Sequence, residues 1–456
     1  MKRDIANDVD PDWAWSSYQP SESRPWTLAM AGHLYRRAAF GATYSELQQA
    51  VSGGPQKTVD RLLRGGEELD AFHHVMDQDE LASAKSGNMG SLRAWWLRRM
   101  LKTPYPLLEK MTLFWHSHFG ISGSRVGDSQ LMLQHIRVLR EHALGKYSSM
   151  LDAVSQDPAV YLGLGAQSSR KAQPNEEFAR QLMHRLSLGP GNFGEEDVSE
   201  ASRAFTGWVV LRGQLRFFDR EHDTGVKKIL GRSGNWKAED VLRIVLEQPV
   251  APRMLVRKLY RWFVSEVEDP SDRLLDPLAE MLAKDYDTGR VVETMLRSNH
   301  FFSAAAYRRR IKSPVEFALE IVRGMEGTLS TVILSEELAQ LGQNLYNPPT
   351  VDGWYGGRHW INSATMTGRC NLAHSLFARN GRYGGKLDPT AIASRYGYDD
   401  PTASPGFLVA LFLQDDLPKS VREELRRTIP SSIDTDGSAL RQFASNAAAL
   451  TEFQLS

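Results

Sequence analysis

This 456-residue sequence has only one cysteine and no excess of charge of either sign. With one cysteine, Cys370, the chain can form neither an intramolecular disulfide nor a thiolate metal cage, so any metal ion would need His, Asp or Glu ligands. Lys and Arg (55) balance Asp and Glu (55). Basic stretches at 93–99 and 308–310 are typical of solvated helix faces, so the sequence gives no clear nucleic-acid signal.

Long apolar runs are missing as well. No stretch approaches the roughly 20 apolar residues that cross a membrane as a helix. The first residues, "MKRDIANDVDPDWAWSSYQP", have Asp, Asn and Pro where a signal peptide needs an apolar region. The sequence as written therefore predicts a cytoplasmic protein, with export open if a leader precedes it.

Common catalytic signatures and strong strand signals are also absent. The sequence contains no Gly-rich phosphate loop, dinucleotide fingerprint, G-x-S-x-G elbow or H-E-x-x-H helix. The best hairpin candidate pairs "WVVL" (208–211) with "QLRFF" (214–218) around Arg212-Gly213. These absences leave a helical protein whose chemistry must be sought outside the familiar motifs.

Helical patterns are abundant. From Leu107 to Phe119 apolar residues recur at steps of three and four, and Gly120 suits a left-handed C-cap. "PNEEFARQLMHRLSLGPG" predicts a helix over 174–188, with proline in its first turn, acids near its start and glycine at its end. Further helical patterns cover 27–51, 56–64, 91–102, 129–144, 195–208, 238–247, 250–265, 271–285, 288–298, 313–325, 335–345, 364–379, 418–427 and 437–453.

These patterns predict a mainly α fold, a large multi-helix domain with at most a small β-hairpin. We expect an N-terminal extension over 1–25, the helical domain over 26–380 and a C-terminal helical extension over 381–456. No fixed-period repeat indicates a solenoid.

The stretch "FWHSHF" places His116 and His118 one residue apart between large aromatics. Side chains two apart on a helix point about 200° apart, so the pair can share a metal ion only if the helix ends between them. Gly120 makes such an end reasonable. A metal pair, an acid/base pair and a core histidine beside an exposed one all remain open.

Two polar segments are candidate catalytic sources. Glu176 and Arg180 lie four residues apart, which fits a surface ion pair or a carboxylate offered to a cleft. "FFDREHDTGVKKILG" holds His222, Asp223 and Lys227 in a loop anchored by aromatics, which suits an oriented base, metal ligands or a charged surface turn.

The loop "NPPTVDGWYGGRHWINSATMTGR" gathers Trp354, Trp360 and Asn362 among glycines and prolines. Aromatic faces beside polar groups are typical of a platform for a sugar or another planar ligand. The alternative is an aromatic plug that closes the core. In either case we expect the two tryptophans to line or cap the same cavity as the His222 loop.

Several stretches together resemble a bacterial family, the domain of unknown function 1800. They span about 30 to 375 and read "HLYRRAAFG", "KMTLFWHSHF", "PNEEFARQLMHRLSLG", "EEDVSEASRAFTGW", "HDTGVKKILG", "VRKLYRWFV", "IKSPVEF" and "LGQNLYNPPTVDGWYGGRHWINSAT".

The resemblance implies a mainly helical fold and no particular reaction. It also implies a sulfatase-like partner protein, because such proteins are often encoded beside the family. Gln181 and His184 depart from the family pattern, which usually has glutamates at these positions, so an activity that needs those glutamates would be altered here.

Two classes of function fit these features. The first is a hydrolase, metal-assisted or using two carboxylates, that acts on a polar or carbohydrate substrate. For the metal-assisted form we expect His118 to meet Glu176 and the His222-Asp223 step around a divalent ion. His116 is then either a second residue of the cleft or packed against Trp115. The second is a non-catalytic helical protein that binds a glycan or protein partner through its aromatic loop and basic helices.

Overall fold

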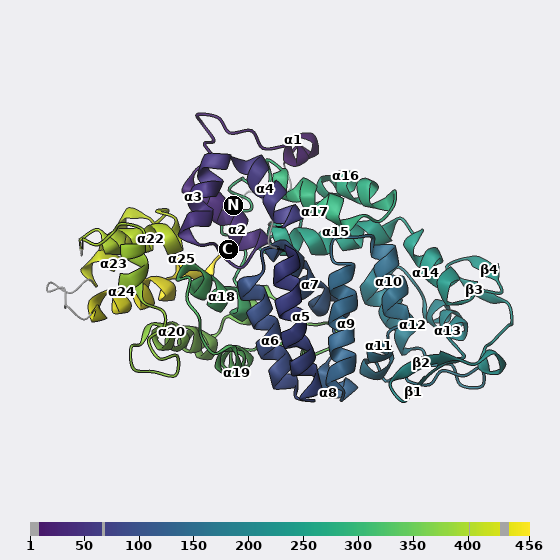
Figure 1. The fold of residues 1–456 in the computed structure, drawn as a ribbon. Helices are drawn as coiled ribbons and strands as arrows, with labels where there is room; N and C mark the ends of the chain where they lie inside the picture. The colour runs from purple at the N-terminus through teal and green to yellow at the C-terminus, as the bar shows by residue number, and fades with distance from the viewer. Residues whose placement is uncertain (1–8, 66–68, 401, 429–436) are drawn as a thin grey trace.

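The computed structural model describes residues 9–65, 69–400, 402–428 and 437–456, and in these ranges the mainly α prediction is confirmed. Figure 1 shows helices packed against one another along the whole molecule, with two small β-hairpins at one end. Among the described helices, none is long and apolar enough to cross a membrane.

All the regular elements described between residues 9 and 204 are helices. The α-helices of this range are α1 (Pro11–Trp15), α2 (Leu28–Ala38), α3 (Tyr44–Gly53), α4 (Pro55–Arg64), α5 (Leu69–Lys85), α6 (Met89–Lys102), α7 (Pro106–Phe119), α8 (Gly123–Val126), α9 (Ser129–Glu141), α10 (Tyr147–Ser155), α11 (Pro158–Gly163), α12 (Glu177–Gln181) and α13 (Glu195–Ala204).

The chain after residue 204 contains the hairpins and the remaining α-helices. These elements are β1 (Trp208–Leu211), β2 (Gln214–Phe217), β3 (Lys227–Ile229), β4 (Arg232–Gly234), α14 (Ala238–Leu246), α15 (Val250–Phe263), α16 (Asp272–Ala283), α17 (Thr288–Arg297), α18 (Pro314–Gly324), α19 (Thr331–Gln340), α20 (Ser363–Phe377), α21 (Pro389–Arg395), α22 (Ser404–Leu413), α23 (Lys419–Arg427), α24 (Ser438–Ala449) and α25 (Thr451–Gln454).

Helix α7 lies at the centre of the fold. All of its residues except Leu108 and Ser117 are buried, because α2, α4, α6 and α9 pack around it. Pro106 occupies its first turn and Gly120, with φ of 64°, ends it in the left-handed conformation. The helix predicted for 107–119 is therefore confirmed, and its C-terminal end opens toward the pocket described below.

The single helix expected over 27–51 is in fact two helices, α2 and α3. The chain turns at Gly41, whose φ of +79° favours glycine and whose position lies close to Glu320 of α18. Thr43 and Glu46 then form a capping box that starts α3. Local turn chemistry thus overrides the helical period that runs across this segment.

The predicted hairpin is confirmed in β1 and β2, which pair antiparallel with Leu211 opposite Gln214. Arg212 and Gly213 both have positive φ, as a tight two-residue turn requires. A second short hairpin, β3 with β4, was not expected, because its strands have three residues each and lack an apolar alternation.

The two terminal segments both pack onto the helical core. Helix α1 lies against α16 and α17, while α24 packs on α20 and α22. Ile311 forms an isolated bridge with Leu455 near the chain end. The first eight residues of the expected 1–25 extension lie outside the described residues, and the boundaries at 25 and 380 stay predictions.

Candidate functional site

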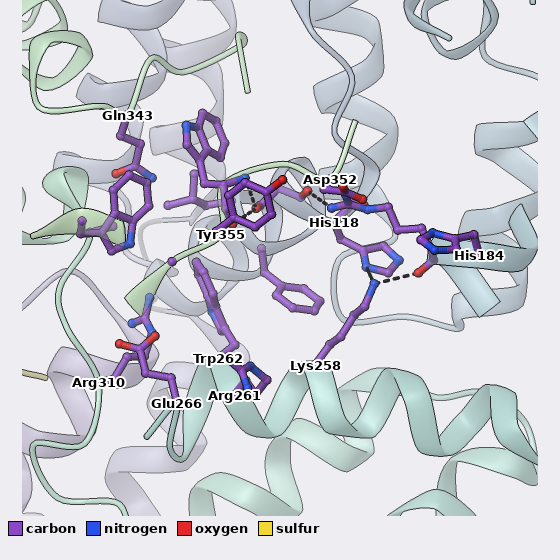
Figure 2. A pocket seen from close by; sticks show the side chains of 18 residues that line it. His118, His184, Lys258, Arg261, Trp262, Glu266, Arg310, Gln343, Asp352 and Tyr355 are labelled. Atoms are coloured by element: carbon purple, nitrogen blue, oxygen red, sulfur yellow. Dashed lines mark hydrogen bonds and ion pairs between the residues drawn. The ribbon is translucent and has the colours of Figure 1, made fainter. Parts of the chain in front are cut away.

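A pocket of about 370 Å³ opens where the C-terminal end of α7 meets α15 and the loop 346–360 (Figure 2). A π-helix, η1 (Leu182–Ser187), adds a third wall, and residues after α15 and before α18 close the far side. Five different parts of the chain, distant in sequence, therefore build one cavity.

Two glycines bring the loop 346–360 onto the end of α7. A Cβ on Gly120 would lie 2.0 Å from the Val351 carbonyl oxygen, and one on Gly353 would lie 2.0 Å from that of Ser117. The two backbones can therefore pack this closely only because neither position has a side chain. The Trp354 amide also donates to Ser117 Oγ at 3.2 Å, which holds the aromatic part of the loop over the pocket.

The π-helix carries Arg185 to the same end of α7. The bond that ends it runs from the Leu188 amide to the Met183 carbonyl, one residue longer than an α-turn. The Arg185 guanidinium donates to the carbonyls of Ser117 and His118, both at 2.7 Å, and to Asp352 at 3.0 Å. It thus satisfies the last turn of α7, where a positive charge also suits the helix dipole.

The α-helix predicted for 174–188 is consequently shorter than expected. Helix α12 begins at Glu177, where Asn175 Oδ1 accepts from the Glu177 amide, and it changes to the π form at Leu182. The apolar spacing does not distinguish the two helix types over one turn. The extra residue in the turn sets the directions of the side chains within it, including Arg185.

Lys258 donates to two acceptors at the pocket wall. Its Nζ donates to the Arg185 carbonyl at 2.7 Å and contacts His118 Nδ1 at 3.3 Å. The other ring nitrogen, Nε2, lies 2.9 Å from the Tyr147 hydroxyl, which donates its own proton to the Leu186 carbonyl at 2.7 Å.

This network assigns the protons around His118. Because the Leu186 carbonyl can only accept, the single Tyr147 proton goes there, and His118 Nε2 must donate to the hydroxyl oxygen. A neutral His118 then has its lone pair on Nδ1, directed to Lys258. A neutral Lys258 amine uses both of its protons on these two acceptors and keeps one lone pair without a protein partner among the described residues.

The environment favours these neutral forms. Burial, followed by the charge of Arg185, lowers the pKa of Lys258 to about 7, while Asp352 opposes the shift. Burial, then Lys258 and Arg185, holds the pKa of His118 well below its usual range. Burial lowers the pKa of Arg185 to about 10.

Glu266 lies on the opposite side of the pocket from Lys258, with Trp262 and Tyr355 between them (Figure 2). Burial raises the pKa of the Glu266 carboxyl, although Arg310 and the Ile311 amide act against the shift. The raised pKa indicates a carboxyl group that keeps its proton more readily than an exposed glutamate.

Arg310 does not neutralise Glu266 fully, because it is already committed to another carboxylate. Its guanidinium makes two bonds to Glu316, at 2.6 and 3.0 Å, and lies 4.4 Å from the centre of the Trp262 ring. Lys110 completes this buried ion cluster on Glu316. The cluster fixes the wall behind Glu266 and leaves that carboxyl facing the pocket.

Of the expected site residues, the structure places His118, Trp354 and Trp360 in the pocket lining. Trp360 is buried and Trp354 half-buried, whereas the neighbouring Tyr355 is 61% exposed at the mouth. The expectation that the two tryptophans share one cavity agrees with this placement. The second half of that expectation does not, because the His222 loop contributes no lining residue.

His222, Asp223 and Lys227 form a separate cluster beside α13. His222 Nδ1 donates to the Thr206 carbonyl at 2.9 Å, and Asp223 makes two bonds with Arg203, at 2.8 and 3.1 Å. Lys227 donates to the carbonyls of Asp223 and Gly225, at 2.6 and 3.0 Å. These bonds connect parts of the loop to one another and to α13. They agree with the interpretation of the segment as a charged surface turn.

Glu176, Arg180 and Asn362 have local roles in the structure. Arg180 pairs with Glu176 at 3.0 Å and with Glu195 at 2.8 Å, near the surface. Asn362 caps α20 by accepting from the Thr365 amide at 2.9 Å. None of the three lines the pocket.

The two histidines of "FWHSHF" do not meet at a common metal position. His116 accepts the Tyr346 amide on Nε2 at 3.1 Å and packs its ring against Trp96 and Trp354, while both nitrogens of His118 are already hydrogen-bonded. Glu176 pairs with Arg180. His222 is hydrogen-bonded to Thr206, and Asp223 pairs with Arg203. Within the described ranges, no group of three or more His, Cys, Asp or Glu is placed to hold a metal ion.

Sequence reasoning missed Lys258, Arg261 and Glu266. A signal was present, since Lys258, Arg261 and Trp262 recur at i, i+3 and i+4 on one face of α15 and all line the pocket. Glu266, which follows the end of that helix, has no motif around it. Its importance depends on burial, which the sequence does not show.

A family model with the description "Protein of unknown function (DUF1800)" matches residues 33–455, which is most of the chain. The chain belongs to the DUF1800 family. Comparisons with curated proteins and with solved structures found no match. In this DUF1800 chain His184 lines the pocket, whereas Gln181 donates to Glu177 at 3.0 Å.

Proposed function

We propose that this DUF1800 protein is an acid–base hydrolase that cleaves polar, ring-shaped substrates such as carbohydrates. One observation carries the proposal. Glu266 and Lys258 lie on opposite sides of one aromatic-walled pocket, and their pKa values are displaced in opposite directions, upward for the acid and downward for the base. Such paired displacement is typical of groups that act as proton donor and proton acceptor.

The walls suit a ring that is apolar on its faces and polar on its edge. Trp262, Trp354, Tyr355 and Trp360 supply aromatic surface, on which the faces of a sugar ring can stack. Gln343, Ser313 and the charged side chains supply polar groups for the edge. The volume of about 370 Å³ is within the range of small-molecule sites.

In the proposed reaction, neutral Lys258 takes a proton from an attacking water molecule while protonated Glu266 gives one to the leaving oxygen. The bond between substrate carbon and leaving oxygen breaks, and the water oxygen replaces it. His118 positions Lys258 by accepting one of its protons, and Tyr147 fixes the His118 tautomer. Proton exchange with solvent then restores both groups.

The test is turnover of a panel of oligosaccharides and polar esters by the purified full chain. Glu266→Gln removes the proton donor and keeps the shape, and we expect it to lower kcat by roughly 10²–10⁴-fold with KM little changed. Arg220→Gln, at a side chain that is 85% exposed and outside the pocket, is the matched control. A substrate that Glu266→Gln cleaves at the wild-type rate would contradict the proposal.

A second candidate is a binding protein without catalysis. Tyr355, exposed at the pocket mouth and 5.2 Å from the His359 ring, presents an aromatic surface that a glycan or protein partner could contact. This candidate predicts saturable binding that Tyr355→Ala weakens, together with no turnover of any bound compound. Calorimetry and product analysis on the same samples separate the two candidates.

A further inference from the structure

We propose that the substrate of this pocket carries a negatively charged substituent, which Arg261 binds at the rim beside Lys258. This inference rests on the proposed function and names the substrate class, an acidic saccharide. It starts from the balance of charges around the cavity.

Each of the two acidic residues in the pocket lining already has an ion-pair partner or a role in the proposed reaction. Asp352 is paired with Arg185 at 3.0 Å. Glu266 is the partly desolvated carboxyl that acts as the proton donor. The lining therefore offers no free carboxylate to its remaining cations.

The cationic side chains of the lining do not all have an acidic partner among the described residues. Arg310 is held by Glu316 and Arg185 by Asp352, but Arg261 has no hydrogen bond or ion pair with any described residue. Lys258 donates only to neutral acceptors, the Arg185 carbonyl and the His118 ring. Because Lys258 is the neutral proton acceptor of the proposed reaction, the positive charge on the α15 side that has no partner among the described residues is the Arg261 guanidinium.

Arg261 and Lys258 are suitably placed to act on one ligand. They are three residues apart on α15, so their Cβ atoms lie about 5–6 Å apart on one helix face. Trp262 follows on the same wall. A ring that stacks on this wall would bring an acidic substituent to the guanidinium, which binds carboxylate or sulfate through two parallel N–H bonds.

Partial desolvation strengthens this recognition. A ring that stacks on the aromatic wall displaces water from beside the Arg261 guanidinium, so an ion pair formed there is stronger than one in bulk water. Arg261 is exposed in the free protein and therefore pays little to remain charged while the pocket is empty. The Arg261 guanidinium therefore stays charged in the empty pocket and forms an ion pair when an acidic ligand binds.

The experiment compares three oligosaccharides with the same ring stereochemistry: galacturonate oligomers, neutral galactose oligomers and sulfated galactose oligomers. Binding to the full chain is measured by calorimetry at two salt concentrations, with Glu266→Gln as the background so that cleavage does not interfere. We expect at least one acidic oligomer to bind roughly tenfold or more tightly than the neutral oligomer, with weaker binding at higher salt. The two acidic arms distinguish a carboxylate from a sulfate.

Substitutions at Arg261 supply the second readout. We expect Arg261→Gln to remove the preference for the acidic oligomer, and Arg261→Lys to keep part of it. Arg220→Gln, which removes the same charge far from the lining, should leave the preference unchanged. Thermal unfolding of each variant shows whether the fold is retained.

The possible outcomes separate this inference from the proposed function. Equal binding of acidic and neutral oligomers, or a preference that survives Arg261→Gln, overturns the inference even if the protein is a hydrolase. A preference that depends on Arg261, without cleavage of the bound oligomer by the wild-type protein, supports the inference and contradicts the hydrolase.

Discussion

Two clusters in this protein contain the same four residue types. The pocket quartet consists of His118, Arg185, Lys258 and Asp352, and the loop quartet consists of His222, Arg203, Lys227 and Asp223. In each, the arginine pairs with the aspartate and the lysine donates to at least one backbone carbonyl. Residue type alone therefore does not distinguish them.

The quartets differ in what surrounds them. Arg203 binds Asp223 and Glu200, whose carboxylates raise its pKa, so the loop quartet has acids to match its cations. In the pocket quartet burial lowers the pKa of Arg185 and of Lys258, and one lysine contact is the ring of His118. The hydrogen bonds and ion pairs of the loop quartet hold a loop together, whereas the pocket quartet presents a lysine with a lowered pKa to a cavity, which is typical of a functional site.

The largest difference is expected from methionine substitutions at the two lysines. Lys258→Met should lower kcat/KM on a cleaved substrate by about 10²–10⁴-fold, because it removes the proposed proton acceptor. Lys227→Met should leave kcat/KM near the wild-type value and mainly lower stability, because it leaves two carbonyls without their donor. Steady-state kinetics and thermal unfolding on both variants test this, and equal losses of activity would remove the distinction between the quartets.

The next largest effect should come from a glycine near each quartet. Gly353→Ala places a Cβ against the Ser117 carbonyl at a φ of +75°, so we expect a loss of about 3 kcal/mol or more in the free energy of unfolding. Gly225→Ala meets only the ends of the Arg203 and Asp223 side chains, at 2.8 and 3.0 Å, and should cost about 1 kcal/mol. Urea unfolding measures both; a Gly353→Ala protein as stable as the wild type would show that the loop is not docked on α7 as described.

The last expected difference is a change of slope, in the pH dependence of stability. Lys258 has a pKa of about 7 in the folded protein, whereas an unfolded lysine titrates near 10.4. Between these values the unfolded chain binds more protons, so this group makes the free energy of unfolding rise with pH from about 7 to about 10. Below pH 7 both states are protonated and its contribution to the slope vanishes.

Lys258→Met should therefore flatten the rise in stability above pH 7. The matched variant, Lys227→Met, should flatten it less, because Asp223 opposes the lowering of the Lys227 pKa by burial. Urea unfolding at a series of pH values gives both slopes. A slope that Lys258→Met leaves unchanged would mean that Lys258 is charged in the folded protein at these pH values.

Elements that depend on neighbouring residues could be predicted from the sequence. Helix α7 follows from its apolar spacing, Pro106 and Gly120, and the β1–β2 hairpin follows from its turn at Arg212 and Gly213. The break at Gly41 and the π-helix at 182–187 were not predicted, because both depend on contacts or on a shift of one hydrogen bond that leaves the apolar pattern unchanged.

The sequence by itself determined a mainly helical DUF1800 chain, placed a histidine at the end of α7 and indicated that an aromatic loop could fold over it. Only the tertiary structure decided which charged groups meet. Residues 118, 185, 258 and 352 come together because Gly120 and Gly353 allow two backbones to pack in contact and because the π-turn directs Arg185 to that junction. Burial at this junction, rather than residue type, displaces the pKa of Lys258, and burial is a property of the packed chain.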